Sequence, residues 1–204
     1  MNNKAMYNLT YGLFICTARD GDKDNGCIVY TVSQVTTSPN RIVVAVNKDN
    51  YTHDMIMKTK EFNISILTEK ASFDTFKHWG FQSGKNVDKA IGIEYCRSDN
   101  GIIYIANQTN AYISATVEQT INLGSHTMFI ASVDDMEMLS SAPSASYAYY
   151  QSSIKPRPEE KILTGKTVWR CTVCGYVYEG EELPADFVCP LCKHPASDFE
   201  KVTS

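Results

Sequence analysis

The sequence predicts a mainly β protein with two domains, an antiparallel β-barrel or sandwich followed by a small metal-stabilised domain. About seven short segments read as strands, with only two or three helical patterns between them, and this mixture favours antiparallel strands over βαβ units. No GxGxxG motif follows a strand, so a Rossmann domain is not indicated. Four of the seven cysteines form two CxxC pairs near the end of the chain, which indicates a metal site.

Length, composition and charge limit the possible functions. The chain has 204 residues, enough for one domain of about 150 residues and a second, small one. Its net charge of −4 and pI of about 5.6 argue against a nucleic-acid partner. No apolar run approaches the roughly 20 residues of a membrane span, and the first residues lack the apolar region and cleavage site of a signal peptide. We therefore expect a cytoplasmic protein that binds neither membrane nor nucleic acid.

The two CxxC pairs predict a tetrahedral Cys₄ site. Cys171 and Cys174 form the first pair, Cys189 and Cys192 the second, and 14 residues separate them. Thiolates suit both zinc and iron, so the spacing alone does not choose the metal. Five aromatic residues are expected to form an apolar shell around the site: Trp169, Tyr176, Tyr178, Phe187 and Phe199. A tail of about 35 residues needs the metal to stay folded.

Alternation and turn signals place the strands and helices in the first part of the chain. Strands are predicted at residues 11–19, 27–35, 41–46, 62–67, 92–95, 102–105, 111–121 and 126–136. The cluster DGDKDNG at 20–26 is a turn, so the first two strands are expected to pair as a hairpin. A helix should begin at Asn50 or Thr52, and another should begin at Ser72 and run to Trp79.

Several other residues have unremarkable predicted roles. His53 and His78 are expected on helix surfaces, Trp79 in the core, and Cys27 as a small buried thiol. The polar, proline-containing stretch near residue 152 reads as a semi-rigid linker. The predicted domains are residues 1–152 and 168–204, joined by a linker at 153–167.

The cysteine-rich end resembles a rubredoxin, the single-iron electron carrier. The resemblance is carried by CTVCGYVY from Cys171, by FVCPLC from Phe187, and by Phe199. The short loop between the two pairs is closer to the rubredoxin-like tail of rubrerythrins. The resemblance implies one iron bound by the four cysteines; a structural zinc ribbon is the alternative.

The first 155 or so residues resemble the flavin reductase-like family of FMN-binding split barrels. Four stretches carry the resemblance: NGCIVYTVSQVTTSPN from Asn25, IVVAVNKDNYTH from Ile42, GFQSGKNVDKA from Gly80, and GSHT from Gly124, where the family usually has Gly-Asp-His. The resemblance implies a split β-barrel, bound FMN and a homodimer. It assigns His126 to the nicotinamide and flavin pocket.

The residue types in these stretches suit FMN. Ser83, Gly84 and Lys85 offer a hydroxyl, a permissive backbone and a cation for a phosphate. Four further candidates lie at a strand end and at a helix N-terminus that could receive an anion: Asn47, Lys48, Asn50 and Thr52. The resemblance places Thr31, Val32, Ser33 and Gln34 against the flavin ring, through backbone as much as side chain.

Two redox modules on one chain predict an electron relay. NAD(P)H would reduce FMN, FMN would reduce the Cys₄ iron, and the tail would reduce another protein. Such fusions resemble the high-molecular-weight rubredoxins of anaerobes, for which the implied acceptor is a flavodiiron protein that reduces oxygen or nitric oxide. The alternatives are a plain flavin reductase and a flavin-binding module with a zinc ribbon.

Overall fold

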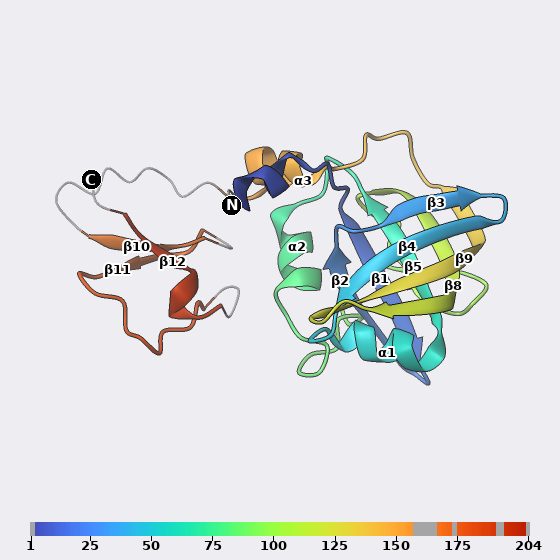
Figure 1. The fold of residues 1–204 in the computed structure, drawn as a ribbon, viewed down its shortest axis with the longest axis horizontal. Helices are drawn as coiled ribbons and strands as arrows, with labels where there is room; N and C mark the ends of the chain where they lie inside the picture. The colour runs from blue at the N-terminus through green and yellow to red at the C-terminus, as the bar shows by residue number, and fades with distance from the viewer. Residues whose placement is uncertain (1–2, 157–166, 173–174, 191–193, 203–204) are drawn as a thin grey trace. The chain divides into compact units, whose positions relative to one another are not determined.

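The chain folds into two compact units, Met1–Ser152 and Ser153–Ser204, shown in Figure 1. The computed structural model describes residues 3–156, 167–172, 175–190 and 194–202. Ten residues of the predicted linker, 157–166, lie outside the described residues. Over the described ranges, no helix combines the length and the apolar character needed to cross a membrane.

The first unit is built on one antiparallel sheet of seven strands, in the order β2-β1-β5-β8-β9-β4-β3. Residues 30–32 join the edge strands β2 and β3. Thr31 holds this joining segment against β4, because its hydroxyl donates to Ala45 O (2.9 Å) and accepts from Ala45 N (3.0 Å). The sheet therefore curves into a barrel (Figure 1). Its strands are β1 (Phe14–Asp20), β2 (Lys23–Val29), β3 (Ser33–Thr37), β4 (Asn40–Asn47), β5 (Glu61–Leu67), β8 (Thr109–Asn122) and β9 (His126–Met138).

The core fills the inside of this barrel. In β4 the buried residues alternate with half-buried ones, so that Ile42, Val44 and Val46 point inward, as the period of two in a strand requires. Phe62 and Phe129, both fully buried, pack in the same cluster. The long pair β8 and β9 shifts register twice, and such bulges bend strands strongly enough to wrap a barrel.

Two helices cover the barrel. Helix α1 (Tyr51–Thr59) buries Met55 and Ile56 and contacts β1 and β2. Helix α2 (Phe73–Gly80) begins after Ser72, whose hydroxyl accepts a hydrogen bond from Thr75 N, as expected of an N-cap serine. It packs Trp79 so closely on β2 that a Cβ at Gly26 would lie 2.8 Å from the indole ring. Glycine at position 26 is therefore a packing requirement.

The remaining elements are short. They are the 3₁₀ helix η1 (Asn3–Asn8), β6 (Cys96–Arg97), β7 (Ile103–Tyr104), α3 (Tyr147–Tyr149) and a π-helical turn, η2 (Tyr150–Ile154). The predicted mainly β barrel is confirmed. The strand predicted at 92–95 is wrong, because Gly92 adopts a positive φ of 75°. The predicted strand at 27–35 is two strands, because residues 30–32 cross from one sheet edge to the other.

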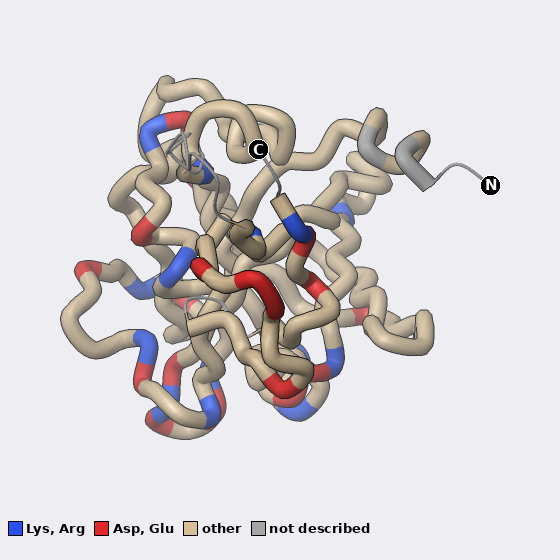
Figure 2. Tube along the Cα trace, turned by 90° about the vertical axis from the view of Figure 1, so that its left-hand side faces the viewer, with Lys and Arg blue, Asp and Glu red and all other residues tan. Residues whose placement is uncertain are grey.

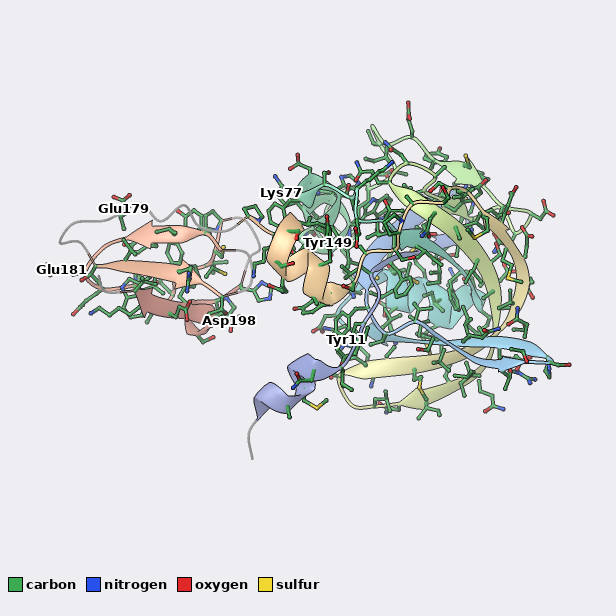
Figure 3. The ribbon with its side chains drawn as sticks, turned by 90° about the horizontal axis from the view of Figure 1, so that it is seen from above. Tyr11, Lys77, Tyr149, Glu179, Glu181 and Asp198 are labelled. Carbon is green, nitrogen blue, oxygen red and sulfur yellow. The ribbon has the colours of Figure 1, made fainter. Side chains whose placement is uncertain are left out.

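The second unit has a sheet of three strands in the order β11-β10-β12. These are β10 (Val168–Cys171), β11 (Val177–Glu179) and β12 (Phe199–Val202), with a 3₁₀ helix, η3 (Ala196–Asp198), before the last strand. Acidic residues mark its surface, and Figure 3 labels Glu179, Glu181 and Asp198 among them. Over the chain as a whole, the basic residues (blue) and acidic residues (red) are interspersed along the trace in Figure 2.

Candidate functional site

Most of the residues predicted to contact the flavin lie in or near the first turn of α1. Asn50 precedes the helix in extended conformation, and its side chain makes no capping hydrogen bond. The backbone N–H groups of a first turn have no partner within the helix, so they can bind an anion. Thr52 lies in this turn but is fully buried. Its hydroxyl accepts from Asn25 Nδ2 at 2.9 Å, so Thr52 serves the packing of the turn.

The loop at 83–85 packs against this turn. Gly84 is buried against Asn25, and a Cβ at Gly84 would lie 2.1 Å from Asn25 Oδ1. Lys85 Nζ lies 3.5 Å from Asp54 Oδ2 in the first turn of α1. Ser83 Oγ accepts from Lys85 N at 3.2 Å. The structure thus brings the predicted phosphate loop to the N-terminus of α1.

A third segment reaches the same region from the turn between β8 and β9. Asn47 pairs with His126 across β4 and β9. Lys48 N donates to Ser125 O at 3.0 Å, and Lys48 Nζ donates to Asn122 Oδ1 at 2.7 Å. His126 is half-buried, and its Nδ1 lies 2.9 Å from Ser125 Oγ. His126 and Lys48 therefore lie together at the end of β4 that leads into α1.

His53 links these segments, and the prediction that it lies on a helix surface is wrong. Its side chain is buried, with Nε2 2.9 Å from Thr127 Oγ1 and Nδ1 3.1 Å from Asp54 Oδ1. The ring also packs on Phe129. A partner 74 residues away in sequence leaves no local signal, so sequence reasoning missed this contact.

Of the residues predicted to contact the flavin ring, Thr31 bonds to Ala45 near the α1 end of β4, whereas Ser33 and Gln34 lie further along the barrel. Gln34 pairs with Ile42, which is about 17 Å along β4 from Asn47 at roughly 3.3 Å per residue. Ser33 and Gln34 are exposed, whereas Val32 packs on the core. The candidate contacts therefore extend along β4 from Gln34 to α1.

Two buried thiols lie on neighbouring strands that helix α1 contacts. Cys16 of β1 pairs with Cys27 of β2, which confirms that Cys27 is buried. Burial raises the pKa of both thiols, and the neighbouring Cys27 raises the pKa of Cys16 further. At Cys27 a hydrogen bond with Thr52 and the charge of Lys89 act against that rise in pKa. Both cysteines are therefore neutral packing residues near neutral pH.

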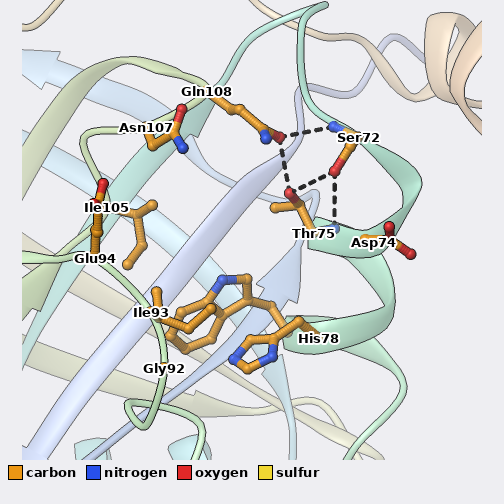
Figure 4. Close-up of a pocket in the computed structure, with 11 residues that line it drawn as sticks. Ser72, Asp74, Thr75, His78, Gly92, Ile93, Glu94, Ile105, Asn107 and Gln108 are labelled. Carbon is orange, nitrogen blue, oxygen red and sulfur yellow. Dashed lines mark hydrogen bonds between the residues drawn. The ribbon is translucent and has the colours of Figure 1, made fainter.

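A cavity of about 520 Å³ opens on another side, between α2 and the loops at 92–94 and 105–108 (Figure 4). Trp79, Ile93 and Ile105 contribute apolar surface to it. Gln108 Oε1 accepts from Ser72 N at 2.7 Å and from Thr75 Oγ1 at 2.8 Å, so this polar side chain supports the start of α2. The lining contains none of the predicted flavin contacts.

In the second unit, two matching turns carry the first cysteine of each pair. Cys171 N donates to Tyr176 O, and Cys189 N donates to His194 O, both at 2.8 Å. Gly175 adopts a positive φ of 81°, which glycine tolerates without strain. Cys171 and Cys189 are buried. Cys174 and Cys192 lie outside the described residues, among which no group of three or more metal-binding side chains occurs.

Four of the five rings predicted to surround the site form one cluster, and one of them, Phe199, pairs with Cys171 across β10 and β12. Phe187 contacts Tyr178 (4.8 Å between ring centroids), Phe199 (5.4 Å) and Tyr176 (6.4 Å). Trp169 pairs with Tyr178 across β10 and β11, and Lys201 lies over its indole ring. Two buried cysteines in matching turns beside an apolar ring cluster fit a thiolate-bound metal.

Comparison with known proteins finds a family match for each of the two units. Residues 6–157 match the flavin reductase like domain, and residues 169–200 match the rubrerythrin, rubredoxin-like domain. A high molecular weight rubredoxin from Moorella thermoacetica is 34% identical across 99% of this chain and 100% of its own length. This chain belongs to the high molecular weight rubredoxin family. Family membership makes it a flavin-dependent oxidoreductase with a rubredoxin-like iron domain.

Other relatives share the barrel of this family. A ferric-chelate reductase (NAD(P)H) from Archaeoglobus fulgidus is 31% identical over 74% of this chain and 89% of its own length. The solved NADH:FAD oxidoreductase of Streptomyces globisporus superposes with a TM-score of 0.63 at 18% identity, over 70% of this chain and 84% of its own. At that identity the superposition shows a shared fold. The likeness to rubrerythrin tails predicted from the short loop is confirmed.

Proposed function

We propose that this chain is an NAD(P)H-dependent flavin oxidoreductase whose electrons leave through the rubredoxin-like domain to a protein acceptor. The observation that supports this most directly is the presence of two redox modules on one chain. One is the barrel of the flavin reductase-like family, and the other contains Cys171 and Cys189 buried in matching turns. When bound, FMN supplies chemistry that connects a two-electron hydride donor with a one-electron iron.

The chain's own residues bind and orient the cofactors. We assign the FMN phosphate to Ser83, Gly84 and Lys85 together with the first turn of α1, because a hydroxyl, a cation and helical N–H groups meet there. The ion pair with Asp54 holds the Lys85 ammonium near the first turn of α1, and the phosphate would compete with Asp54 for this ammonium.

The remaining contacts are assigned to the neighbouring strands. Asn47, Lys48 and Asn50 lie next to the phosphate region. We assign the flavin ring to residues 31–34, in the segment that leads into β3 and in its first two residues. We assign a catalytic role to His126, whose Nδ1 is oriented by Ser125. Cys171, Cys174, Cys189 and Cys192 are the proposed ligands of one iron.

The setting of this activity is also part of the proposal. We expect a cytoplasmic protein. A homodimer, and a flavodiiron protein as the electron acceptor, are proposed because the family resemblance implies them. An acceptor that takes single electrons matches a one-iron donor, which can deliver only one at a time.

Substitution of one proposed iron ligand tests this function. Cys174→Ser should leave NADH–flavin turnover near the wild-type rate but abolish reduction of an added flavodiiron protein, followed as nitric oxide consumption without oxygen, because reduced flavin itself reacts with oxygen. Cys96→Ser, at an exposed thiol, is the matched control and should retain both activities. If the Cys174 variant still reduces the acceptor, the tail is dispensable and the protein is a plain flavin reductase. One zinc per chain in the wild type would make the tail a structural ribbon.

A further inference from the structure

Lys89 is a lysine in an unusual place. Only 3% of its surface is exposed, whereas lysines are almost never fully buried unless they are paired. Its Nζ donates to Gly26 O and to Trp79 O, each at 2.8 Å. No carboxylate pairs with it among the residues that the structure describes. Two backbone carbonyls therefore satisfy this buried ammonium.

Both carbonyls are suited to a cation. Trp79 lies in the last turn of α2, where carbonyls lack intrahelical partners and the helix dipole is negative. Gly26 lies on β2, an edge strand of the sheet, and an edge strand has carbonyls that no neighbouring strand uses. In addition, Lys89 O lies 2.8 Å from His78 Nε2. The side chain and the backbone of Lys89 both attach this point of the chain to α2.

Lys89 also closes the loop that contains the proposed phosphate site. Between residues 82 and 89, only Gly84 and Lys89 are buried. They rest on consecutive residues of β2, because Gly84 packs on Asn25 and Lys89 bonds to Gly26. The loop is thus attached to β2 at two points. Lys85 lies between these two attachments.

We propose that Lys89 is a positioning residue that fixes the loop at 83–85 for the phosphate of the flavin. The inference rests on the proposed role of that loop. Lys89 donates to protein carbonyls and so acts through the backbone, whereas Ser83 and Lys85 would meet the phosphate. Without the bonds of the Lys89 ammonium, the loop would keep the contact of Gly84 with Asn25, the ion pair of Lys85 with Asp54 and the contact of His78 with Lys89 O. It would no longer be attached to Gly26 of β2, and the hydroxyl and cation of the loop would be held less firmly.

A pair of ligands that differ only in the phosphate separates this role from general support of the fold. FMN and riboflavin share the ring system, and riboflavin lacks the phosphate. For Lys89→Met we expect the dissociation constant of FMN to rise by about tenfold to hundredfold, the range of one or two charge-assisted hydrogen bonds. The dissociation constant of riboflavin should change little. Lys70→Met, at an exposed lysine, makes the same charge change and should leave both constants unchanged.

Two outcomes would overturn the inference. If Lys89→Met weakens FMN and riboflavin equally, or leaves both unchanged, Lys89 does not position the phosphate loop. If Lys89→Met does not fold, Lys89→Gln replaces it. Gln can still donate to one carbonyl, and it should give an intermediate ratio of the two constants. A wild-type protein that binds riboflavin as tightly as FMN would instead refute the phosphate role of the loop, independently of any variant.

Discussion

Gly84→Ala is the substitution for which the structure gives the sharpest steric expectation. An added Cβ would lie 2.1 Å from Asn25 Oδ1, 2.4 Å from its Cγ and 2.7 Å from its Nδ2. Gly84 does not have a left-handed φ, so alanine suits the backbone and the effect is purely one of space. Asn25 is buried and bonded to Thr52, so it cannot turn aside without losing that hydrogen bond.

The magnitude follows from these contacts. Overpacking typically costs about 1–3 kcal/mol, and losing the hydrogen bond between Asn25 and Thr52 adds about 1 kcal/mol. The lower chain entropy of alanine in the unfolded state returns about 0.4–1 kcal/mol. We expect Gly84→Ala to lower the free energy of unfolding by about 2–3 kcal/mol if Asn25 yields. If the loop yields instead, the stability loss will be smaller and FMN affinity will fall.

The assay combines urea unfolding, followed by circular dichroism, with titration of flavin fluorescence. Gly80→Ala is the matched control, because its Cβ would meet only Ile28 Cγ1, at 3.3 Å, and Ile28 Cβ, at 3.7 Å. Alanine also favours a helix over glycine by about 1 kcal/mol, so this control should be neutral or stabilising. A Gly84→Ala protein with wild-type stability and wild-type FMN affinity would refute the close packing of the loop on Asn25.

Three further predictions concern thiols, protonation and assembly. In the iron-loaded protein a thiol reagent should modify the exposed Cys96 at once. It should modify Cys16 and Cys27 only on unfolding, because these two thiols are buried and burial raises their pKa. Mass spectrometry of the labelled sites checks this. Burial lowers the pKa of Lys89 from 10.5 to about 8. The unfolded chain therefore binds more protons between those values, and the free energy of unfolding should rise by at most about 3 kcal/mol as pH increases through them. In urea unfolding at about pH 7 and about pH 10, Lys89→Met should lack this rise, and an equal rise in both proteins would contradict the shift. Light scattering should give twice the chain mass of 22.8 kDa if the protein is a homodimer, and a mass of one chain would exclude it.

The strands were predictable where burial follows the local pattern. Residues 42–46 are an unbroken apolar run, and within β4 they bury every second side chain, Ile42, Val44 and Val46. Ser72 could be identified as an N-cap because capping depends on one side chain and the next turn. The CxxC pairs and their aromatic shell were equally local. These signals need no knowledge of distant partners.

The missing parts of the site depend on contacts between distant segments. His53 is buried because Thr127 and Phe129 come from β9, and nothing in the helical pattern of residues 51–59 indicates this. Lys89 was not singled out, because a charged residue in a loop is normally exposed. Its carbonyl partners belong to β2 and α2. The turn chemistry at Gly92 similarly overrode a strand pattern at 92–95.

The central claim, that electrons pass from a flavin barrel to a rubredoxin-type iron on one chain, is tested most directly by an absorption spectrum. The spectrum of air-oxidised protein is recorded and then repeated after anaerobic addition of NADH, with metal content measured on the same sample. The account predicts thiolate-to-iron(III) bands over a flavin spectrum, one iron per chain, and bleaching of both by NADH. A flavin-only or colourless spectrum with one zinc per chain would contradict it.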